Sequence, residues 1–243
     1  MINWCPSCRS VISDLETDER ILRGHLWHIR YPGVDETQDV IVATTRPETL
    51  LGDSGVAVHP TDVRWQSAVG KEVLLPLMNR KIPIVSDEHA DPEMGSGAVK
   101  VTPAHDPNDY EIGKRHNLPE ITVIGYDATM TPSAGDFADQ DRFECRNNVV
   151  EALQKEGFLE KIEDHEHAVP HHDKCGTIIE PLPMEQWFMN MQHLADKARP
   201  VLQQGEIEYF PDRFREYALA LSLIHISEPT RPRLISYAVF CLK

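Results

Sequence analysis

The chain has 243 residues, of which 41% are hydrophobic and 26% charged, and its 24 basic residues are outnumbered by 39 acidic ones, for a formal net charge of −15. Such a length and composition suit an ordinary globular protein of one large or two small domains, and exclude collagen-like, coiled-coil and fully disordered chains. This negative net charge excludes a general electrostatic attraction to nucleic acid, so any contact with RNA must be made by a few basic residues at one place. No stretch approaches the roughly 20 apolar residues of a membrane helix, and the first residues do not resemble a signal peptide. A cytoplasmic protein without a membrane partner is expected.

Short strands are predicted in the first half of the chain, because runs rich in branched and aromatic residues are interrupted by Pro and Gly. The predicted strands are 21–31, 39–45, 55–60, 71–77, 81–86, 97–102 and 121–126. Helices are predicted at 107–116, which opens with Asp-Pro, and at 147–159, which has one apolar face, and a third near Glu185. Breaks about every ten residues favour a β-rich α+β fold with a barrel of short strands over a βαβ sheet.

The segment 221–243 differs in character from the rest of the chain. It reads LSLIHISEPTRPRLISYAVFCLK and is similar to the conceptual translation of a transposon-type sequencing adaptor, which matches Leu221 to Arg231 and Ile235 to Leu242 in one reading frame. We therefore expect adaptor read-through rather than native protein, with the natural chain cut short near Ala220. The alternative is a genuine C-terminal strand or anchor.

Residues of metal-binding type lie at opposite ends of the chain. Cys5 and Cys8 form a CxxC motif, while His172 and Cys175 form an HxxC motif. The five cysteines do not suggest a disulfide framework. Three thiolates and one imidazole would make a closed tetrahedral zinc site, so a structural Zn²⁺ is predicted that clamps the two ends of an inserted domain. The alternative is that the thiols are free and the histidine lies on the surface.

The sequence TTRPET, from Thr44 to Thr49, follows a predicted strand. Threonine hydroxyls and free backbone N–H groups at a strand end can hold ribose and carbonyl oxygens, and Arg46 offers a fork that suits a phosphate or carboxylate. The alternative is a Pro-bounded turn in which Thr and Glu48 merely cap a helix start. The residues alone slightly favour this alternative.

The sequence GSGAVKVTPAHDPNDYEIG occupies residues 95–113. Asp106 before a proline is typical of a helix N-cap, and Asp109 stands where a capping-box acid would stand. In the functional interpretation both carboxylates project with His105 into a pocket, where Asp106 binds a cation such as an α-ammonium group and Asp109 accepts from a hydroxyl. A metal-dependent hydrolase built on His105, Asp106 and Asp109 is a further alternative, although no third ligand cluster matches it.

Several segments in this order resemble the editing insertion of the valyl-tRNA synthetases. They are INWCPSC, VATTRPETLLGD, GSGAVKVTPAHDPNDYEIGKRHNLP, DRFECRNNVVEAL and CGTIIEP…QWF, and the resemblance covers essentially residues 1–217. The leucyl enzymes are similar at TTRPDT and AHDxRD, and the isoleucyl enzymes typically read TTTPWT and PGHG. TTRPET together with VKVTPAHDPNDYEIG is the valyl form.

The resemblance implies a proofreading site that hydrolyses threonyl-tRNA(Val) and spares valyl-tRNA(Val). Valyl-tRNA synthetases are the standard example of a hydrophobic pocket that cannot strongly reject an isostere carrying a hydroxyl, which calls for a second, hydrolytic site. The partners implied are the acceptor end of tRNA(Val) and misactivated threonine, in a parent ligase expected to be monomeric. The ATP-binding motifs of that parent are absent from these residues, so ATP is expected only in a catalytic domain outside this chain.

The resemblance also implies roles for single residues. Asp106 is expected to hold the α-ammonium group, Asp109 to sense the threonine hydroxyl, and Lys100 to approach the RNA backbone. Thr44, Thr45 and Arg46 are expected to line the pocket and hold the terminal adenosine, and Glu48, His105 and Met94 are further candidates for substrate binding. Two positions depart from the family pattern: His172 replaces a cysteine, and Met94 stands where an aromatic residue is expected.

The expected organisation is an editing domain inserted in a two-stranded zinc-knuckle stem. Its parts are the first half of the stem at 1–20, the editing domain at 21–164, the second half of the stem at 165–190, the start of a return into a missing catalytic domain at 191–220, and the adaptor segment. The alternatives are an inactive zinc-ribbon binding module and the editing fragment of a leucyl or isoleucyl relative.

Overall fold

The computed structural model describes residues 1–186, 192–216 and 218. The chain divides into two compact units, one formed by 1–12 and 16–183 and the other by 13–15 and 184–243. The predicted adaptor segment lies outside the described residues. The helix expected near Glu185 is described only from Gln192, as α3 (Gln192–Gln204), because 187–191 also lie outside them. None of the described helices is long and apolar enough to cross a lipid bilayer.

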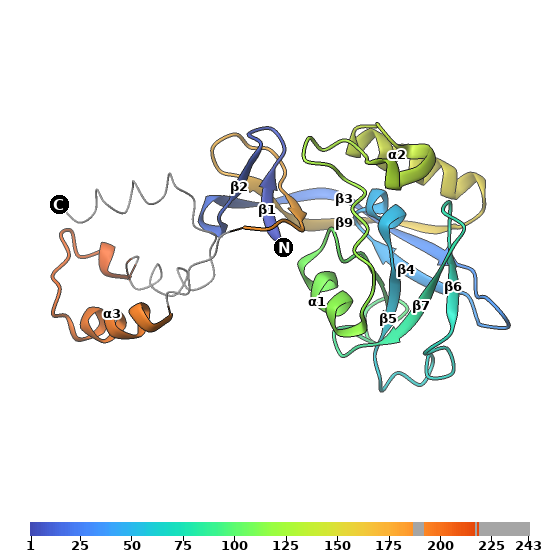
Figure 1. The fold of residues 1–243 in the computed structure, drawn as a ribbon, viewed down its shortest axis with the longest axis horizontal. Helices are drawn as coiled ribbons and strands as arrows, with labels where there is room; N and C mark the ends of the chain where they lie inside the picture. The colour runs from blue at the N-terminus through green and yellow to red at the C-terminus, as the bar shows by residue number, and fades with distance from the viewer. Residues whose placement is uncertain (187–191, 217, 219–243) are drawn as a thin grey trace. The chain divides into compact units, whose positions relative to one another are not determined.

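The first unit is rich in β structure and has few helices (Figure 1). In chain order its elements are β1 (Ile2–Cys5), β2 (Ser10–Ile12), η1 (Asp14–Glu16), β3 (Thr17–Tyr31), β4 (Val40–Thr44), η2 (Pro47–Gly52), β5 (Gly55–Val58), β6 (Glu72–Leu75), β7 (Arg80–Ser86), β8 (Ala98–Val101), α1 (Pro107–His116), η3 (Pro132–Phe137), α2 (Arg142–Lys155), β9 (Leu159–His172) and β10 (Glu180–Leu182). The 3₁₀ helix η1 spans residues of both units.

The described strands form three open sheets, with the orders β10-β1-β2, β4-β3-β9 and β6-β7-β5-β8. Strands β5 and β7 pair in parallel, whereas the other pairs of named strands are antiparallel. No closed barrel is found among these strands, so the predicted barrel is not confirmed. Regular breaks in a sequence predict short strands, but the pairing of the first and last strand that closes a barrel leaves no local signal.

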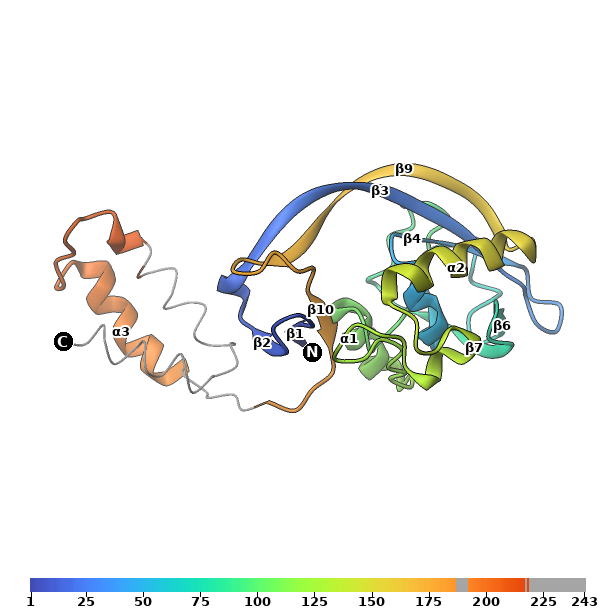
Figure 2. The same cartoon turned by 90° about the horizontal axis from the view of Figure 1, so that it is seen from above.

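The longest pairing joins β3 and β9 in a curved two-stranded ribbon that is visible along its length in Figure 2. Its register runs from Thr17↔His172 to Ile29↔Leu159. Strand β9 was not predicted, because much of it has no covering layer and its charged sequence therefore lacks the alternation that marks a half-buried strand. For the same reason β3 begins four residues before the predicted strand 21–31.

The main hydrophobic core lies under one end of this ribbon. Trp27, Ile29 and Tyr31 of β3 are buried there together with apolar side chains from β4 to β7, η2 and α2. In α2 the buried residues Cys145, Val149 and Leu153 recur at helical spacing. The core therefore spans residues 27–153 and forms the rigid support of the site described below.

Most of the predicted strands and both predicted helices of the first unit are found, with shifted ends for the second helix. The predicted helix 107–116 is α1, whereas the predicted helix 147–159 is α2, which begins five residues earlier and ends four residues earlier. Its true start was hidden because Arg142 is a charged residue that is buried. The helix ends before Gly157, which has the left-handed φ of +76°.

The prediction of a strand at 121–126 was wrong. This segment forms only an isolated bridge, between Ile124 and Met130. The backbone N–H groups of Val123 and Ile124, which a strand would offer to a neighbouring strand, are instead donated to Nε2 of His105 at 2.9 and 3.3 Å. The apolar character of the segment comes from burial in the core, because both residues are fully buried.

Candidate functional site

The start of helix α1 presents two carboxyl groups. Asp106 is the N-cap in extended conformation, and its Oδ1 accepts hydrogen bonds from the N–H groups of Asn108 at 2.8 Å and Asp109 at 3.1 Å. Pro107 follows at the first helical position, where its missing N–H costs nothing. Asp106 therefore caps the helix, and this cap fixes both aspartates at the N-terminal end of the helix.

A cavity of about 340 Å³ opens beside this helix start. It is lined by Leu26, Ala43, Thr44, Thr45, Arg46, Thr49, His89, Met94, Val99, Lys100, Thr102, His105, Asp106, Asn108, Asp109 and His165. The structure thus brings together the TTRPET turn, the strand β8 and the start of α1, as the functional interpretation requires. Of the site residues proposed from the sequence for this pocket, Glu48 is the one that does not line it.

Asp109 is a buried carboxyl group at the cavity wall. Its Oδ2 accepts from the backbone N–H of Thr102 at 2.8 Å, and the residue is 7% exposed. Burial, reinforced by the negative charge of Asp106, raises the pKa of Asp109 to about 7, although Lys100 acts in the opposite direction. The Asp109 carboxyl group therefore changes charge near neutral pH. In its ionised form it is a hydrogen-bond acceptor whose buried negative charge is not fully balanced by Lys100.

Lys100 is buried in the same wall. Its Nζ donates to Thr49 Oγ1 at 3.0 Å, to Thr102 Oγ1 at 2.6 Å and to Asp53 Oδ1 at 3.3 Å. These acceptors use all three N–H groups of an ammonium. In this structure Lys100 holds the wall together, and its expected approach to RNA stays a prediction.

Asp53 joins this wall to the core below it. It accepts from the hydroxyl groups of Tyr31 and Thr102, both at 2.5 Å, as well as from Lys100. Burial raises the pKa of Asp53, and burial together with the charge of Asp53 raises that of Tyr31. The sequence analysis assigned no role to Asp53, Thr102 or Tyr31, because their contact joins three separate segments.

Arg46 and Glu48 lie in a network of buried charges. Arg46 Nε donates to Glu48 Oε1 at 3.2 Å, and Arg146 of α2 donates to both oxygens of Glu48 at 2.8 Å. Burial opposes ionisation of Glu48, but its bonds to Arg146 and the positive charges of both arginines lower its pKa overall. Glu48 is fully buried, so its contact with a ligand would be made through Arg46.

His105 is held as a neutral ring. Its Nε2 accepts from two backbone N–H groups, which leaves the proton on Nδ1, and Nδ1 is buried without a hydrogen-bond partner. Burial, together with the positive charges of Arg46 and Lys100, lowers the pKa of His105 to about 3. The ring nitrogen that would bind a metal is thus occupied at Nε2, which disfavours a metal-dependent hydrolase at residues 105–109.

The remaining residues of the pocket lie at its rim. Thr44 is buried and its Oγ1 accepts from the N–H of Arg46 at 3.0 Å, whereas Thr45 is half-buried. Met94 is 71% exposed. His89 and His165 also line the cavity and were missed by the sequence analysis. No signal marked His165, because its strand, β9, was itself unpredicted.

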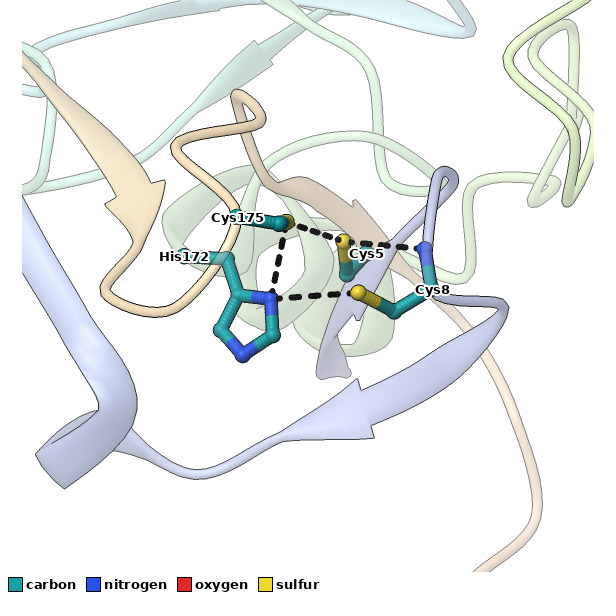
Figure 3. Close-up of side chains that lie close together, drawn as sticks. All are labelled: Cys5, Cys8, His172 and Cys175. Atoms are coloured by element: carbon teal, nitrogen blue, oxygen red, sulfur yellow. Dashed lines mark hydrogen bonds between the residues drawn. The ribbon is translucent and has the colours of Figure 1, made fainter.

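Cys5, Cys8, His172 and Cys175 lie together, as Figure 3 shows, with one potential ligand atom of each within 4.8 Å of the others. The Sγ atoms of Cys5 and Cys175 are 3.5 Å apart, and His172 Nδ1 lies 3.5 Å from Cys8 Sγ and 3.0 Å from Cys175 Sγ. Zn–S bonds of about 2.3 Å at a tetrahedral ion put sulfur atoms roughly 3.8 Å apart. This donor set could hold a metal ion and fits zinc.

The comparisons with known proteins find an editing-domain family and the valine--tRNA ligases. Residues 66–167 match the family described as "Leucyl-tRNA synthetase, editing domain". Valine--tRNA ligase of Clostridium tetani is 50% identical over 88% of this chain and 24% of that protein, and the enzyme of Synechocystis sp. is 52% identical over the same shares. Valine--tRNA ligase of Thermotoga maritima is 47% identical over 90% of this chain and 25% of that protein. The chain therefore spans about a quarter of these relatives.

Among solved structures, GlLeuRS-CP1 aligns with a TM-score of 0.48 at 14% identity, over 58% of this chain and 99% of that one. The family match defines the class as the editing domains of aminoacyl-tRNA synthetases, and its residues 66–167 include the cavity-lining residues from His89 to His165. Within that class, the identity of about 50% to the valine--tRNA ligases shows that the chain is an editing-domain part of the valyl-tRNA synthetase family.

Proposed function

We propose that the cavity beside α1 hydrolyses threonyl-tRNA(Val) and spares valyl-tRNA(Val), within a parent enzyme that attaches valine to tRNA(Val) with ATP. The observation that carries this proposal is a buried carboxyl group, Asp109, beside the half-exposed Asp106 in one cavity. The two carboxyl groups provide acceptors for two polar groups of an esterified threonine: the α-ammonium, which every aminoacyl ester carries, and the hydroxyl, which valine lacks. The relatedness to valine--tRNA ligases supports the choice of amino acid.

The roles of the two aspartates follow from their environments. Asp106 keeps one carboxylate oxygen outside its capping bonds and is assigned to the α-ammonium group. Asp109 is assigned to the threonine hydroxyl. A valyl ester would leave this buried acceptor unpaired, at a cost of about 1–3 kcal/mol, so valine is rejected through polarity rather than size.

The acceptor end of the tRNA is assigned to the other side of the cavity. Thr44, Thr45 and Arg46 hold the terminal adenosine, with Met94 at the rim, while Glu48 acts through Arg46. His105 carries an unpaired Nδ1–H that can donate to the substrate. Lys100 orders the wall between the two aspartates and the turn.

The reaction needs no nucleophilic side chain. A water molecule attacks the ester carbonyl carbon, the bond from that carbon to the ribose oxygen breaks, and threonine and a free ribose hydroxyl leave. The pocket contributes orientation of water and ester, and backbone dipoles that stabilise the developing negative charge. The hydroxyl groups of the substrate itself further assist the attack of water on the ester.

We assign a structural zinc ion to Cys5, Cys8, His172 and Cys175. Its tetrahedral shell would be complete, so the ion supplies a cross-link and no open coordination position. The proposed domains are a knuckle stem at 1–20 and 165–190, an editing domain at 21–164, and a return towards the catalytic domain at 191–220. The parent enzyme is assigned to the cytoplasm as a monomer.

The decisive experiment compares threonyl-tRNA(Val) and valyl-tRNA(Val) as substrates of this chain, with circular dichroism to establish folding. Selective release of threonine is expected. A folded sample that releases neither amino acid, or both at the same rate, would contradict the proposal. Chelator treatment distinguishes the metal-dependent alternative, because it should not stop a reaction that uses water and carboxylates alone.

A further inference from the structure

Arg46 is held by acceptors from separate parts of the fold. Its Nη2 donates to Glu180 Oε2 at 2.6 Å, its Nε to Glu48 Oε1 at 3.2 Å and its Nη1 to the carbonyl oxygen of His105 at 3.3 Å. A guanidinium has five N–H groups, so two remain for a ligand. The side chain is 27% exposed and lines the cavity.

Glu180 stands out among these acceptors because it lies 134 residues from Arg46, on β10. It is 2% exposed and does not line the cavity. Strand β10 pairs with β1, where Glu180 stands opposite Trp4. The orientation of Arg46 therefore depends on a carboxylate from a different sheet than those that line the pocket.

A second arginine fixes the other oxygen of Glu180. Arg142, at the start of α2, donates from Nη1 to Glu180 Oε1 and from Nη2 to the carbonyl oxygen of Ile178 at 3.0 Å. Arg142 is 3% exposed. A carboxylate held on one oxygen by a buried guanidinium presents its other oxygen in a fixed direction, towards Arg46.

The arginines of this network outnumber its glutamates. In the ion pairs of the described residues, Arg46, Arg142 and Arg146 pair with Glu48 and Glu180, which makes three positive charges against two negative ones. Of these five residues, Arg46 is the one that lines the cavity. Arg46, which Glu180 orients, is therefore the member of the network that can contact a ligand, in a cavity that also holds the carboxyl groups of Asp106 and Asp109.

We propose that Glu180 is a positioning residue for Arg46 in editing, and that it fixes the two unused N–H groups of Arg46 for the acceptor end of the tRNA. The inference rests on the proposed editing function. It adds a residue from outside the pocket motifs, which acts through Arg46 and does not touch the substrate.

The test uses Glu180→Asp, which keeps the charge but shortens the side chain by one carbon, so that one carboxylate can no longer span both arginines. We expect KM for threonyl-tRNA(Val) to rise about tenfold with kcat nearly unchanged, because a contact made in both ground and transition states has been weakened. In an Arg46→Ala background the same change should have no further effect, since interacting residues are not additive. The matched control is Glu160→Asp. Glu160 pairs with Arg30 at 2.7 Å, and neither residue lines the cavity, so this change shortens a carboxylate side chain away from the site.

The outcomes are distinct. An unchanged KM in folded Glu180→Asp, or an equal loss in the wild-type and Arg46→Ala backgrounds, would overturn the inference while leaving the editing function in place. If the wild-type chain releases no threonine, the proposed function itself fails. Should Glu180→Asp not fold, Arg142→Lys provides the second variant, which keeps the charge and loses the second N–H contact; a KM equal to that of the wild type would then overturn the inference.

Discussion

At the scale of single residues, the pocket depends on carboxyl groups whose environments differ. Asp106 is half-exposed and caps a helix, whereas Asp109, three residues later, is buried with a pKa raised to about 7. Only helix geometry separates them, because the N-cap points its side chain back over the first turn while the third residue of the helix turns into the wall. In the proposed function these two chemically identical residues therefore have different tasks.

The first prediction concerns the pH dependence of threonine release. A raised pKa means that Asp109 is protonated below about pH 7 and becomes a charged acceptor above it. After subtraction of spontaneous ester hydrolysis, kcat/KM for threonyl-tRNA(Val) should therefore rise between pH 6 and 8. Asp109→Asn, which can still accept from the N–H of Thr102, should lack this inflection. Superimposable pH profiles for the two proteins would refute the role of Asp109.

The second prediction separates the capping and binding roles of Asp106. Asp106→Ala should lower the hydrolysis of every aminoacyl ester about 10- to 100-fold, because all share the α-ammonium and a charged hydrogen bond is worth about 1.5–3 kcal/mol. Asp106→Ser keeps an N-cap but removes the charge, so it should fold with normal stability and show the same loss in single-turnover deacylation. Near-normal rates in the serine variant would leave Asp106 with a capping role alone.

At the scale of elements, the sequence was informative where local chemistry decides the structure. Helix α1 was predicted with its ends, and its start was marked by Asp106 and Pro107; in the structure Asn117, at a φ of +53°, closes it. The segment 121–126 was misassigned because a ring nitrogen of His105 takes the backbone N–H groups that would mark a strand. Partners so distant in sequence cannot be inferred from periodicity.

In the candidate site too, features that depend on local sequence were predicted, and features that depend on partners distant in sequence were not. The motifs TTRPET and AHDPND placed half of the cavity-lining residues in advance. Glu180 and Arg142 were not singled out, because a buried charge looks like a surface charge until its partner is known. What sequence reasoning missed is thus the support of the pocket, together with lining residues such as His89 and His165.

The third prediction concerns the ion pairs of Glu48, which connect η2 to α2. Glu48→Gln removes the buried charge that Arg46 and Arg146 share, which should lower the free energy of unfolding by about 3–5 kcal/mol. Because the pKa of Glu48 is lowered in the folded state, this stabilisation is present above about pH 4.5 and is lost as the pH falls through the lowered value. Urea unfolding at pH 7 measures it, with the exposed Glu151→Gln as control. Equal losses in both variants would contradict the prediction.

At the scale of the whole molecule, the chain is acidic, but two basic side chains, Arg46 and Lys100, lie in the wall of the cavity. The net charge of −15 opposes general attraction to RNA, and the cavity also holds the carboxyl groups of Asp106 and Asp109. If this chain binds an acceptor end as proposed, through so few basic contacts, the salt dependence of binding is expected to be shallow. In the proposed function, selectivity for the esterified amino acid rests on the buried acceptors rather than on affinity for the nucleic acid.

The last prediction concerns the metal cluster, which joins the β1–β2 hairpin to the end of β9 (Figure 3). A cross-link between Cys5 and Cys175, 170 residues apart, closes a very long loop, and such a constraint stabilises the folded state by on the order of 4 kcal/mol. Removal of bound Zn²⁺ with a chelator should therefore lower the melting temperature by several degrees, and added Zn²⁺ should restore it. His172→Ala should abolish stoichiometric zinc binding, whereas His172→Cys, which completes a set of four thiolates, should retain it. A melting temperature that is indifferent to chelator in a protein shown to contain zinc would contradict the structural role.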